Sequence, residues 1–421
     1  PAAGQLVGTA TYIPWCGDAA CENLITPTVH NTTQDTWHVT IQGAIDAAAD
    51  GDVIEVGPGT YAENVVINKP NLTLQSSGTA EETIVLASTG VGISVLENLG
   101  TVTVDGFTVE GWTTAGISQS WTQRAGTTFI VKNNIVNGTG DEVHGNCIQV
   151  TGDDSLVEGN VVDGAYYTGT GEYGASGILV YLANNAIVRN NVVTNADIGI
   201  AVAGGGAYGQ SSMTGALVID NEVSLSEIGI SVSFDANNTT IQDNFVHDNE
   251  LGLLEEYNWG YGPTGTVALH NKIVDNTEQA LTESFDETTP IPSGHIFMAE
   301  ANWWGSIAGP GETEINEYVD YSPWCGDEIC SFLVYPMVGT DLQASIDATP
   351  AGGTLYVPAG TYSDATGGSY GYDVGGITLI LGDGVVIANP DDSCFSITQS
   401  HTRILSESIG GAKCGPNGYV T

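Results

Sequence analysis

A short motif that recurs along most of the chain restricts the fold more than any other feature. An aliphatic residue is followed three positions later by asparagine and five positions later by a second aliphatic residue, as in Val131-x-x-Asn134-x-Val136. The asparagines that carry the motif are Asn134, Asn160, Asn191, Asn221, Asn244 and Asn271, with Phe107 in the equivalent place before them and Asn302 after them. Successive members lie 23 to 31 residues apart. Repeats of this length are typical of solenoids, in which each repeat packs only on its neighbours.

The residues between the asparagines predict short β-strands. A second apolar run follows each motif, for example at 177–180, 199–202 and 229–232. These runs are rich in β-branched residues, are bounded by Gly, Asn or Asp, and are too short for helices. Repeats of this length with two or three strands each predict an all-β fold, a parallel β-helix, whose inward aliphatic side chains stack into one continuous core.

The repeated asparagines are expected to have a structural role. Equivalent residues of successive coils stack about 4.8 Å apart, so a column of asparagines can form an amide ladder that satisfies the backbone groups of the turn. Asparagine also tolerates the left-handed backbone conformation that a tight corner needs. We therefore interpret the column as a ladder and not as a ligand site.

Two segments resemble known β-helix proteins. Residues 39–61 resemble the opening of pectin-lyase-like proteins, in which a short amphipathic helix, here residues 41–49, caps the first coil and a Pro-Gly-Thr-Tyr turn follows a strand. Residues 302–311, which begin Asn-Trp-Trp-Gly, are similar to the closing motif of surface-located right-handed β-helix proteins. The resemblance spans residues 35–311 and implies a right-handed parallel β-helix. It implies no single activity, because this superfamily includes lyases, hydrolases, epimerases, adhesins and structural proteins.

A longer repeat predicts how the chain is organised. Residues 12–21 recur at 321–330, an offset of 309 residues, and residues 41–61 recur at 342–362, an offset of 301 residues. We expect three parts: the closing segment of a preceding unit at 1–34, a complete β-helix unit at 35–334, and the start of a second β-helix unit at 335–421. This arrangement predicts self-association or tandem repeats joined end to end.

The seven cysteines favour an oxidising compartment. Two close pairs share the form Cys-Gly-Asp-x-x-Cys, and neither pair is accompanied by the further Cys or His that a metal site needs. Three disulfides are predicted, namely Cys16–Cys21, Cys325–Cys330 and Cys394–Cys414. Cys147 is left unpaired and is expected to be buried. The protein is therefore expected to be secreted and extracellular, at the cell surface.

The charge balance excludes several partners and suggests another. The chain has 50 acidic and 7 basic residues, a formal net charge of −43. Such a surface repels nucleic acids and anionic membranes, and no apolar run is long enough to span a bilayer. It attracts divalent cations, of which Ca²⁺ best suits clustered oxygen ligands. The candidate metal ligands are Asp141, Glu142, Asp153 and Asp154, near His144; the alternative is that these residues form solvated turns.

The sequence carries no recognisable catalytic motif. The basic residue and calcium cluster of a pectate lyase, and the aspartate motifs of a polygalacturonase, are not found as motifs. Four tyrosines on glycine-rich loops are candidates for contact with a glycan or a partner protein, namely Tyr166, Tyr167, Tyr173 and Tyr208. The leading hypothesis is an extracellular structural protein, a unit of a filament, sheath, surface layer or stalk. The alternative is a secreted polysaccharide-active enzyme, a lyase or hydrolase, or a glycan-binding adhesin.

Overall fold

The described residues form two units in which nearly all of the regular secondary structure is β-strand. The computed structural model describes residues 15–16, 24–119, 126–138, 145–167, 174–206, 211–284, 290–311, 313–363, 370–372, 376–388, 394–397, 402–407, 412–414 and 418–420. The first unit comprises residues 1–267 and 275–297, and the second comprises residues 268–274 and 298–421. Two strands, β31 (Val267–Leu269) and β34 (Phe297–Met298), contain the residues where the division falls. The predicted boundaries at residues 34/35 and 334/335 stay predictions.

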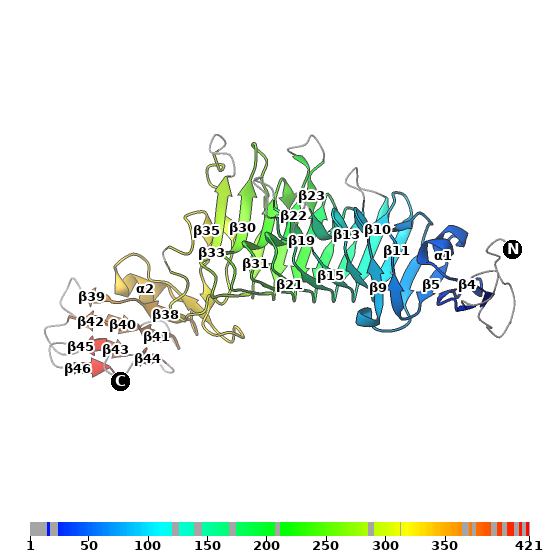
Figure 1. Cartoon of the computed structure of the whole chain (residues 1–421). Helices are drawn as coiled ribbons and strands as arrows, with labels where there is room; N and C mark the ends of the chain where they lie inside the picture. Colours follow the sequence, from blue (N-terminus) through cyan, green and yellow to red (C-terminus); the bar gives the residue numbers. More distant parts are fainter. Residues whose placement is uncertain are drawn as a thin grey trace. The chain divides into compact units, whose positions relative to one another are not determined.

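The first unit is a solenoid of parallel strands in three sheets (Figure 1). The first sheet has nine strands, in the order β7 (Val65–Ile67), β10 (Val91–Val95), β13 (Ala115–Gln119), β16 (Asn146–Val150), β19 (Ser176–Tyr181), β22 (Ile198–Ala203), β26 (Ile228–Ser233), β30 (Leu251–Tyr257) and β33 (Glu278–Ser284). Each strand pairs with the strand of the next coil, so the predicted parallel β-helix is confirmed.

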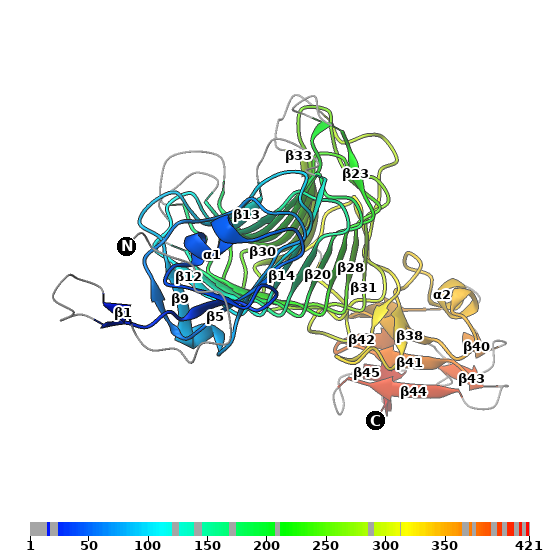
Figure 2. The ribbon, with the colours of Figure 1, turned by 90° about the vertical axis from the view of Figure 1, so that its right-hand side faces the viewer.

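The second and third sheets follow the same order. The second contains β4 (Thr36–His38), β3 (Val29–Asn31), β5 (Val53–Val56), β8 (Thr73–Ser76), β11 (Gly100–Asp105), β14 (Thr127–Lys132), β17 (Leu156–Glu158), β20 (Ile187–Arg189), β24 (Leu217–Ile219) and β28 (Thr240–Gln242). In this sheet β3 is antiparallel to both β4 and β5, and the strands from β5 onward are parallel. The third contains β6 (Gly59–Tyr61), β9 (Thr83–Leu86), β12 (Thr108–Glu110), β15 (Ile135–Asn137), β18 (Val161–Asp163), β21 (Val192–Thr194), β25 (Glu222–Ser224) and β29 (Phe245–His247). Figure 2 shows the sheets as separate faces of this unit.

Short elements complete the first unit. They are β1 (Trp15–Cys16) paired with β2 (Leu24–Ile25), the 3₁₀ turn η1 (Ala80–Glu82), and β23 (Met213–Thr214) paired with β27 (Ala236–Asn237). The core is a stack of inward aliphatic side chains, which alternate with outward residues along each strand. One column of the first sheet consists of fully buried Ile93, Ile117, Ile148, Ile178, Ile200, Ile230 and Leu253.

The predicted opening helix is present as α1 (Ile41–Ala47), although it is two residues shorter than expected. Thr40 Oγ1 accepts from the backbone N–H of Gly43 at 3.1 Å, as a helix N-cap does. Buried Ile41 and Ile45 hold the helix against the strands of the first coils. The helix ends at Ala47 because Ala48 is extended and the Asp52 carboxylate accepts from the next N–H, that of Ala49.

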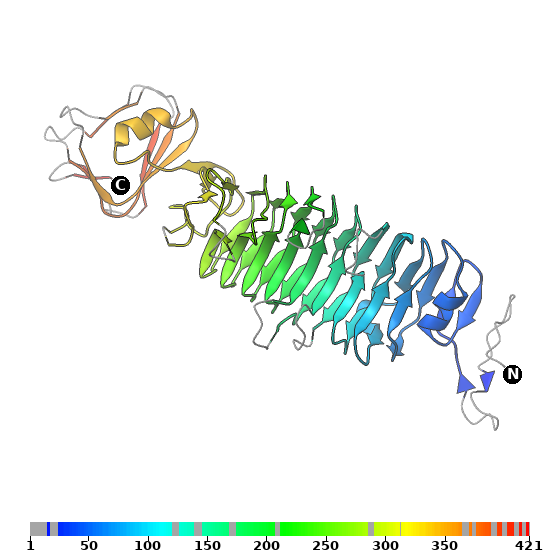
Figure 3. The same ribbon diagram turned by 90° about the horizontal axis from the view of Figure 1, so that it is seen from above.

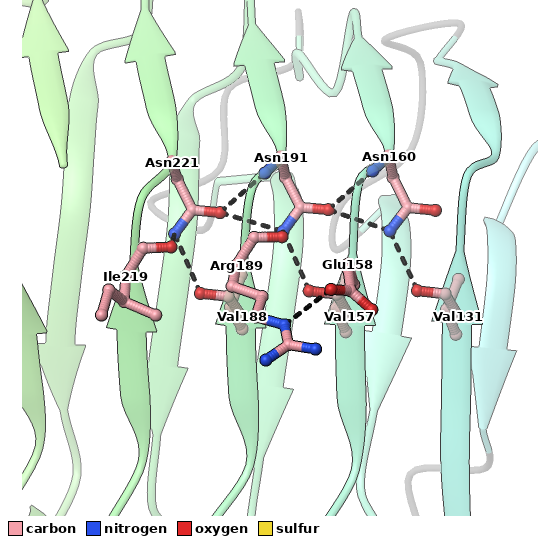
Figure 4. A network of polar contacts seen from close by, with 9 residues as sticks. All are labelled: Val131, Val157, Glu158, Asn160, Val188, Arg189, Asn191, Ile219 and Asn221. Atoms are coloured by element: carbon pink, nitrogen blue, oxygen red, sulfur yellow. Dashed lines mark hydrogen bonds and ion pairs between the residues drawn. The ribbon is translucent and has the colours of Figure 1, made fainter. Parts of the chain in front are cut away.

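The asparagine column forms the predicted ladder in the turn between the second and third sheets (Figure 4). Asn191 Oδ1 accepts from both the backbone N–H and the side-chain amide of Asn160, each at 2.9 Å. The Asn191 amide in turn donates to the carbonyl of Val157 and to Asn221 Oδ1. The same bonds recur from Asn134 to Asn244 and between Asn271 and Asn302, and the ladder side chains are no more than 2% exposed. The ladder therefore pairs backbone groups that water cannot reach.

The left-handed residues of this turn lie one position before the ladder. Asn133, Asn190, Asp220, Asp243 and His270 have φ between 53° and 56°, and each directly precedes a ladder asparagine. The expectation that the ladder asparagines adopt this conformation was wrong. Their amide groups point along the solenoid axis to reach the next coil, while the preceding residue makes the sharp bend.

The second unit contains the start of another solenoid. Helix α2 (Leu342–Ala348) is followed by β38 (Thr354–Val357) and β39 (Gly360–Tyr362), in the order of α1, β5 and β6. Parallel strands continue through β40 (Tyr370–Tyr372), β41 (Thr378–Leu381), β42 (Val385–Ile387), β43 (Phe395–Ile397), β44 (Arg403–Ser406) and β45 (Ala412–Cys414), with β46 (Gly418–Val420) antiparallel to β45. Figure 3 shows this unit and the stacked strands of the first unit from above.

A disulfide-closed turn precedes this second solenoid. The unit also contains β32 (Lys272–Val274), β35 (Val319–Asp320), β36 (Trp324–Cys325) and β37 (Leu333–Tyr335). Cys325 and Cys330 are disulfide-bonded, as predicted. Cys394 is also disulfide-bonded, but the side chain of its predicted partner Cys414 lies outside the described residues, as does the predicted Cys16–Cys21 bond. Cys147 is buried and free, as expected.

Candidate functional site

The predicted metal ligands lie in a turn and in a part of the chain that the structure does not describe. Asp153 Oδ1 accepts from the backbone N–H of Asn184 at 2.8 Å. Asp154 has a φ of 58°, and its Oδ1 accepts from the Asn185 amide at 3.1 Å. Both carboxylates therefore link one coil to the turn of the next.

The other predicted ligands, Asp141 and Glu142, lie outside the described residues together with His144. Within the described part of the chain, no three His, Cys, Asp or Glu side chains are grouped so that they could hold a metal ion. The calcium site stays a prediction.

Two of the four predicted contact tyrosines are described, and both lie beside carboxylates. Tyr166 is 44% exposed and its hydroxyl is hydrogen-bonded to Glu227. The backbone N–H of Tyr167 donates to Asp197 Oδ2 at 3.0 Å. Tyr173 and Tyr208 lie outside the described residues.

A column of carboxylates lies near Tyr166, at the N-terminal ends of three strands of the first sheet. Asp197, Glu227 and Glu250 directly precede the first residues of β22, β26 and β30, which are in register. Partial burial raises the pKa of Glu227, and the neighbouring charges of Asp197 and Glu250 raise it further. The column is a negatively charged rim that sequence analysis did not identify.

A second group of polar side chains lies at the end of the first sheet and was also not predicted. Along one inward column, Val150, Val180, Val202 and Val232 are stacked in register, and the next member is Glu255. Glu255 is fully buried, with a relative exposure of 0%. A carboxyl group thus stands in the hydrophobic core where the preceding coils have valine.

His295 is the partner of this buried carboxyl group. The imidazole Nε2 is hydrogen-bonded to Glu255 Oε2, and the two side chains are 8% and 1% exposed. Nδ1 lies 2.9 Å from the hydroxyl of Tyr257, which itself donates to the carbonyl of Pro263. Because the tyrosine proton is used in that bond, Nδ1 carries a proton and donates to the hydroxyl oxygen. The other imidazole nitrogen and the Glu255 carboxyl group then share one further proton.

One oxygen of this carboxyl group has no partner. Glu255 Oε1 is buried and makes no hydrogen bond within the described residues. Burial raises the pKa of Tyr257, and the charges of Glu255 and Asp235 raise it further, so the tyrosine stays protonated. Leaving a buried carboxylate oxygen unpaired is costly.

A strained turn above this pair exposes two aromatic side chains. Asn258 and Tyr261 exchange backbone hydrogen bonds of 2.8 and 2.9 Å, and the two central residues, Trp259 and Gly260, both have a left-handed φ. Trp259 and Tyr261 are 41% and 40% exposed. Such a conformation is uncommon for tryptophan and persists only where the surroundings impose it. The turn presents both rings to solvent.

Three carboxyl groups lie near the turn. Glu256 and Glu283 are paired neighbours on the outward face of β30 and β33. Burial raises the pKa of both, and the charge of Glu283 adds to the effect on Glu256. Asp235 Oδ1 accepts from the backbone N–H of Gly262 at 3.1 Å and holds the far end of the turn. This aromatic–carboxylate group, residues 255–261 with Asp235, Glu283 and His295, can accept hydrogen bonds from ligand hydroxyls and stack on an apolar ring face.

A signal for this group is present in the sequence. The run Gly252-Leu-Leu-Glu255 aligns with Gly229-Ile-Ser-Val232 in the preceding coil. A glutamate in a position that four coils fill with valine indicates a buried, paired carboxyl group. His295 carries no comparable signal, since it lies between Asn271 and Asn302 but outside the strands of that repeat.

Comparison with known proteins agrees with the fold. Residues 115–289 match the family model of the right handed beta helix region. An 85-residue stretch, 20% of this chain, is 36% identical to a cell surface glycoprotein of Methanothermus fervidus. The match covers 14% of that protein's length.

Similar solved structures include an alginate lyase (12% identity, TM-score 0.42, 88% of this chain and 70% of that one). An exopolygalacturonase from Yersinia enterocolitica is 12% identical, with a TM-score of 0.37 over 90% of this chain and 76% of that one. An alpha-1,3-glucanase from Streptomyces thermodiastaticus is 14% identical, with a TM-score of 0.38 over 90% of this chain and 66% of that one. No helix in the described part of the chain is long and apolar enough to cross a membrane. The parallel strand pairs of the three sheets, together with the match over residues 115–289, show that the fold is a right-handed parallel β-helix.

Proposed function

We propose that this protein is a structural component of the cell surface, a β-solenoid unit of a filament, sheath, surface layer or stalk. The observation that carries the proposal is the second solenoid start in the second unit. Helix α2 and strands β38 and β39 begin 301 residues after α1, β5 and β6. Tyr61 and Tyr362 make the same hydroxyl bond of 2.7 Å to the carbonyl four residues earlier. The same order of one helix and two strands thus occurs twice in the chain.

Two further observations support this proposal. The relative from Methanothermus fervidus is named a cell surface glycoprotein. The Cys325–Cys330 disulfide suits an oxidising exterior, where such bonds persist. A solenoid has no limit on its length, because each coil is stabilised by its neighbours alone. Tandem solenoids therefore make long, stiff surface structures from one repeated unit.

Immunogold labelling of intact cells and negative-stain microscopy of the native surface material test this proposal together. We expect gold particles on the cell exterior and ordered polymers whose axial repeat equals the length of one unit. Label confined to the cell interior would refute the surface assignment. Dispersed monomers in the native material would refute the structural role.

The aromatic–carboxylate group favours a second function, contact with a neutral glycan. Exposed aromatic rings stack on sugar rings, and nearby carboxylates accept hydrogen bonds from sugar hydroxyls. The net charge of −43 would repel a polyuronate, so the ligand is expected to be uncharged. This candidate fits an adhesin, or a polysaccharide-active enzyme that uses Glu256 and Glu283.

Replacing Trp259 with glycine tests the glycan function without disturbing the turn, because glycine adopts the observed φ of 48° freely. We expect binding to a neutral-glycan array to fall at least about tenfold, the loss expected when an aromatic stacking contact is removed. Leu225→Gly is the matched control, since Leu225 is 58% exposed and also has a left-handed φ, but lies in another turn. Equal binding by wild type and Trp259→Gly would exclude this site.

A further inference from the structure

The second sheet carries a column of charges that alternate in sign. Asp105, Lys132, Glu158 and Arg189 stand in register on the adjacent strands β11, β14, β17 and β20. Lys132 Nζ lies 3.1 Å from Asp105, and Arg189 Nε lies 2.7 Å from Glu158. The four side chains are 22% to 43% exposed, so they still face solvent. We call these four residues the charge column.

This use of basic residues is unusual for the chain. Only 7 of its 421 residues are Lys or Arg. Four of these, Lys69, Arg124, Lys132 and Arg189, belong to the first unit, and two of the four stand on alternate coils of one column. The charge column has no net charge, whereas the whole chain carries −43. These four residues therefore add no net repulsion between two copies.

An aliphatic column runs beside the charge column. Ile130, Leu156, Ile187 and Leu217 are paired neighbours on β14, β17, β20 and β24. Ile130, Leu156 and Ile187 lie two positions before the charged residue of the same strand, so both columns point outward on one face. All four are only partly buried. The second sheet thus presents a flat apolar strip next to a charged strip.

The order of charges makes this face complementary to itself. Read along the solenoid, the signs are minus, plus, minus, plus; read in reverse, they are plus, minus, plus, minus. A two-fold axis parallel to the strands reverses the solenoid direction and places each column opposite its own copy. Asp105 then faces Arg189 of the second copy, and Lys132 faces Glu158. Each of these four charges meets an opposite charge. Ile130 then faces Leu156 of the second copy, while Ile187 and Leu217 face Thr103 and Thr73.

We propose that this face of the second sheet, formed by the charge column and the aliphatic column, is a lateral docking surface for a second copy of the chain in antiparallel orientation. Burial of the aliphatic columns supplies the attraction, and the alternating charges set the register and direction. The contact is side by side, so it goes beyond the end-to-end arrangement of tandem units and does not depend on it.

Charge exchange within one ion pair separates this role from a local structural one. In Asp105→Lys/Lys132→Asp, the ion pair within the chain is kept, but the signs become plus, minus, minus, plus. In the antiparallel pair, every position would then face a like charge. Adding Glu158→Arg and Arg189→Glu gives plus, minus, plus, minus, which is again complementary to itself. The quadruple variant thus restores docking only if the column faces its own copy.

Sedimentation velocity at about 0.15 M NaCl, where the Debye length is about 8 Å, measures these differences. We expect wild type to dimerise reversibly at up to about 100 μM, as weak lateral contacts do. The dimer dissociation constant should rise at least about tenfold in the double variant and return to within about threefold of wild type in the quadruple variant, since like charges across an interface cost several kcal/mol. Raising the salt concentration should weaken the wild-type dimer and strengthen that of the double variant.

The aliphatic column provides a second test that leaves all charges of the column in place. Leu156→Ser should weaken the dimer, whereas Val192→Ser, at an exposed valine of the third sheet, should not. Melting temperatures confirm that each variant is folded. A monomeric wild type, a double variant that dimerises like wild type, or a quadruple variant that fails to recover would each overturn the proposal.

Discussion

Burial of the Glu255 carboxyl group in the hydrophobic core costs free energy. Glu255 occupies a place in the inward column that Val150, Val180, Val202 and Val232 occupy in earlier coils, and valine there needs no partner. A buried carboxyl group needs a close partner to compensate for lost hydration, and His295 is that partner. The pair ties the segment before β34 to the end of β30, beneath the turn that exposes Trp259.

A double-mutant cycle measures what this pair contributes. The two single variants are Glu255→Val and His295→Leu. His295→Leu should lower the free energy of unfolding by about 3 kcal/mol, because it leaves a buried carboxyl group without its partner. Glu255→Val/His295→Leu should cost much less, since it restores the valine of the column and removes both polar groups. Thermal and urea unfolding give these values. Additive single and double effects would show that the two residues are not coupled.

Only one part of the candidate site could be predicted from the sequence. Glu255 stands at a repeat position where its polarity is anomalous, and so the printed sequence contains that signal. The pairing with His295 depends on the path of the chain after β33, which no periodic pattern specifies. The same holds for the exposure of Trp259, which depends on a two-residue turn whose residues are not those usual for left-handed turns.

The asparagine ladder acts as one element that spans many coils. Asn191→Ala should lower the free energy of unfolding by about 2 to 4 kcal/mol, because the buried amide groups of Asn160 lose their acceptor and the carbonyl of Val157 loses a donor. Thermal unfolding followed by circular dichroism measures the loss.

Asn190→Gly is the matched control for this prediction. Asn190 is exposed and has a φ of 54°, which glycine adopts without strain, so its replacement should change stability by less than about 0.5 kcal/mol. If both variants lose the same stability, the turn matters through its backbone shape and not through the amide ladder.

The strands and the ladder were predictable because they repeat. The same pattern recurs in each coil, so an atypical residue in one coil does not change the predicted strands. Local exceptions were not predictable in this way. Helix α1 ends two residues early because Asp52 accepts from the N–H of Ala49, and that contact depends on the position of the following strand.

The charge of the whole molecule is unevenly distributed. The chain carries −43, yet the second sheet has a strip in which acidic and basic residues balance. In the proposed dimer, the net charge opposes contact over most of the surface, and the balanced strip is the place where two copies meet. The total charge follows from composition alone, whereas the alternation of signs depends on the strand register that places residues 105, 132, 158 and 189 side by side.

The ladder also determines how such a protein can change length during evolution. Each ladder asparagine accepts hydrogen bonds from the asparagine of the preceding coil and donates hydrogen bonds to the asparagine of the following coil. A duplication that adds one whole coil reproduces all of these bonds and leaves no buried group unpaired. A duplication of part of a coil shifts the register, so that valines turn outward and the amides lose their partners. Selection therefore favours the gain and loss of whole coils, so the length of the solenoid changes in steps of one coil.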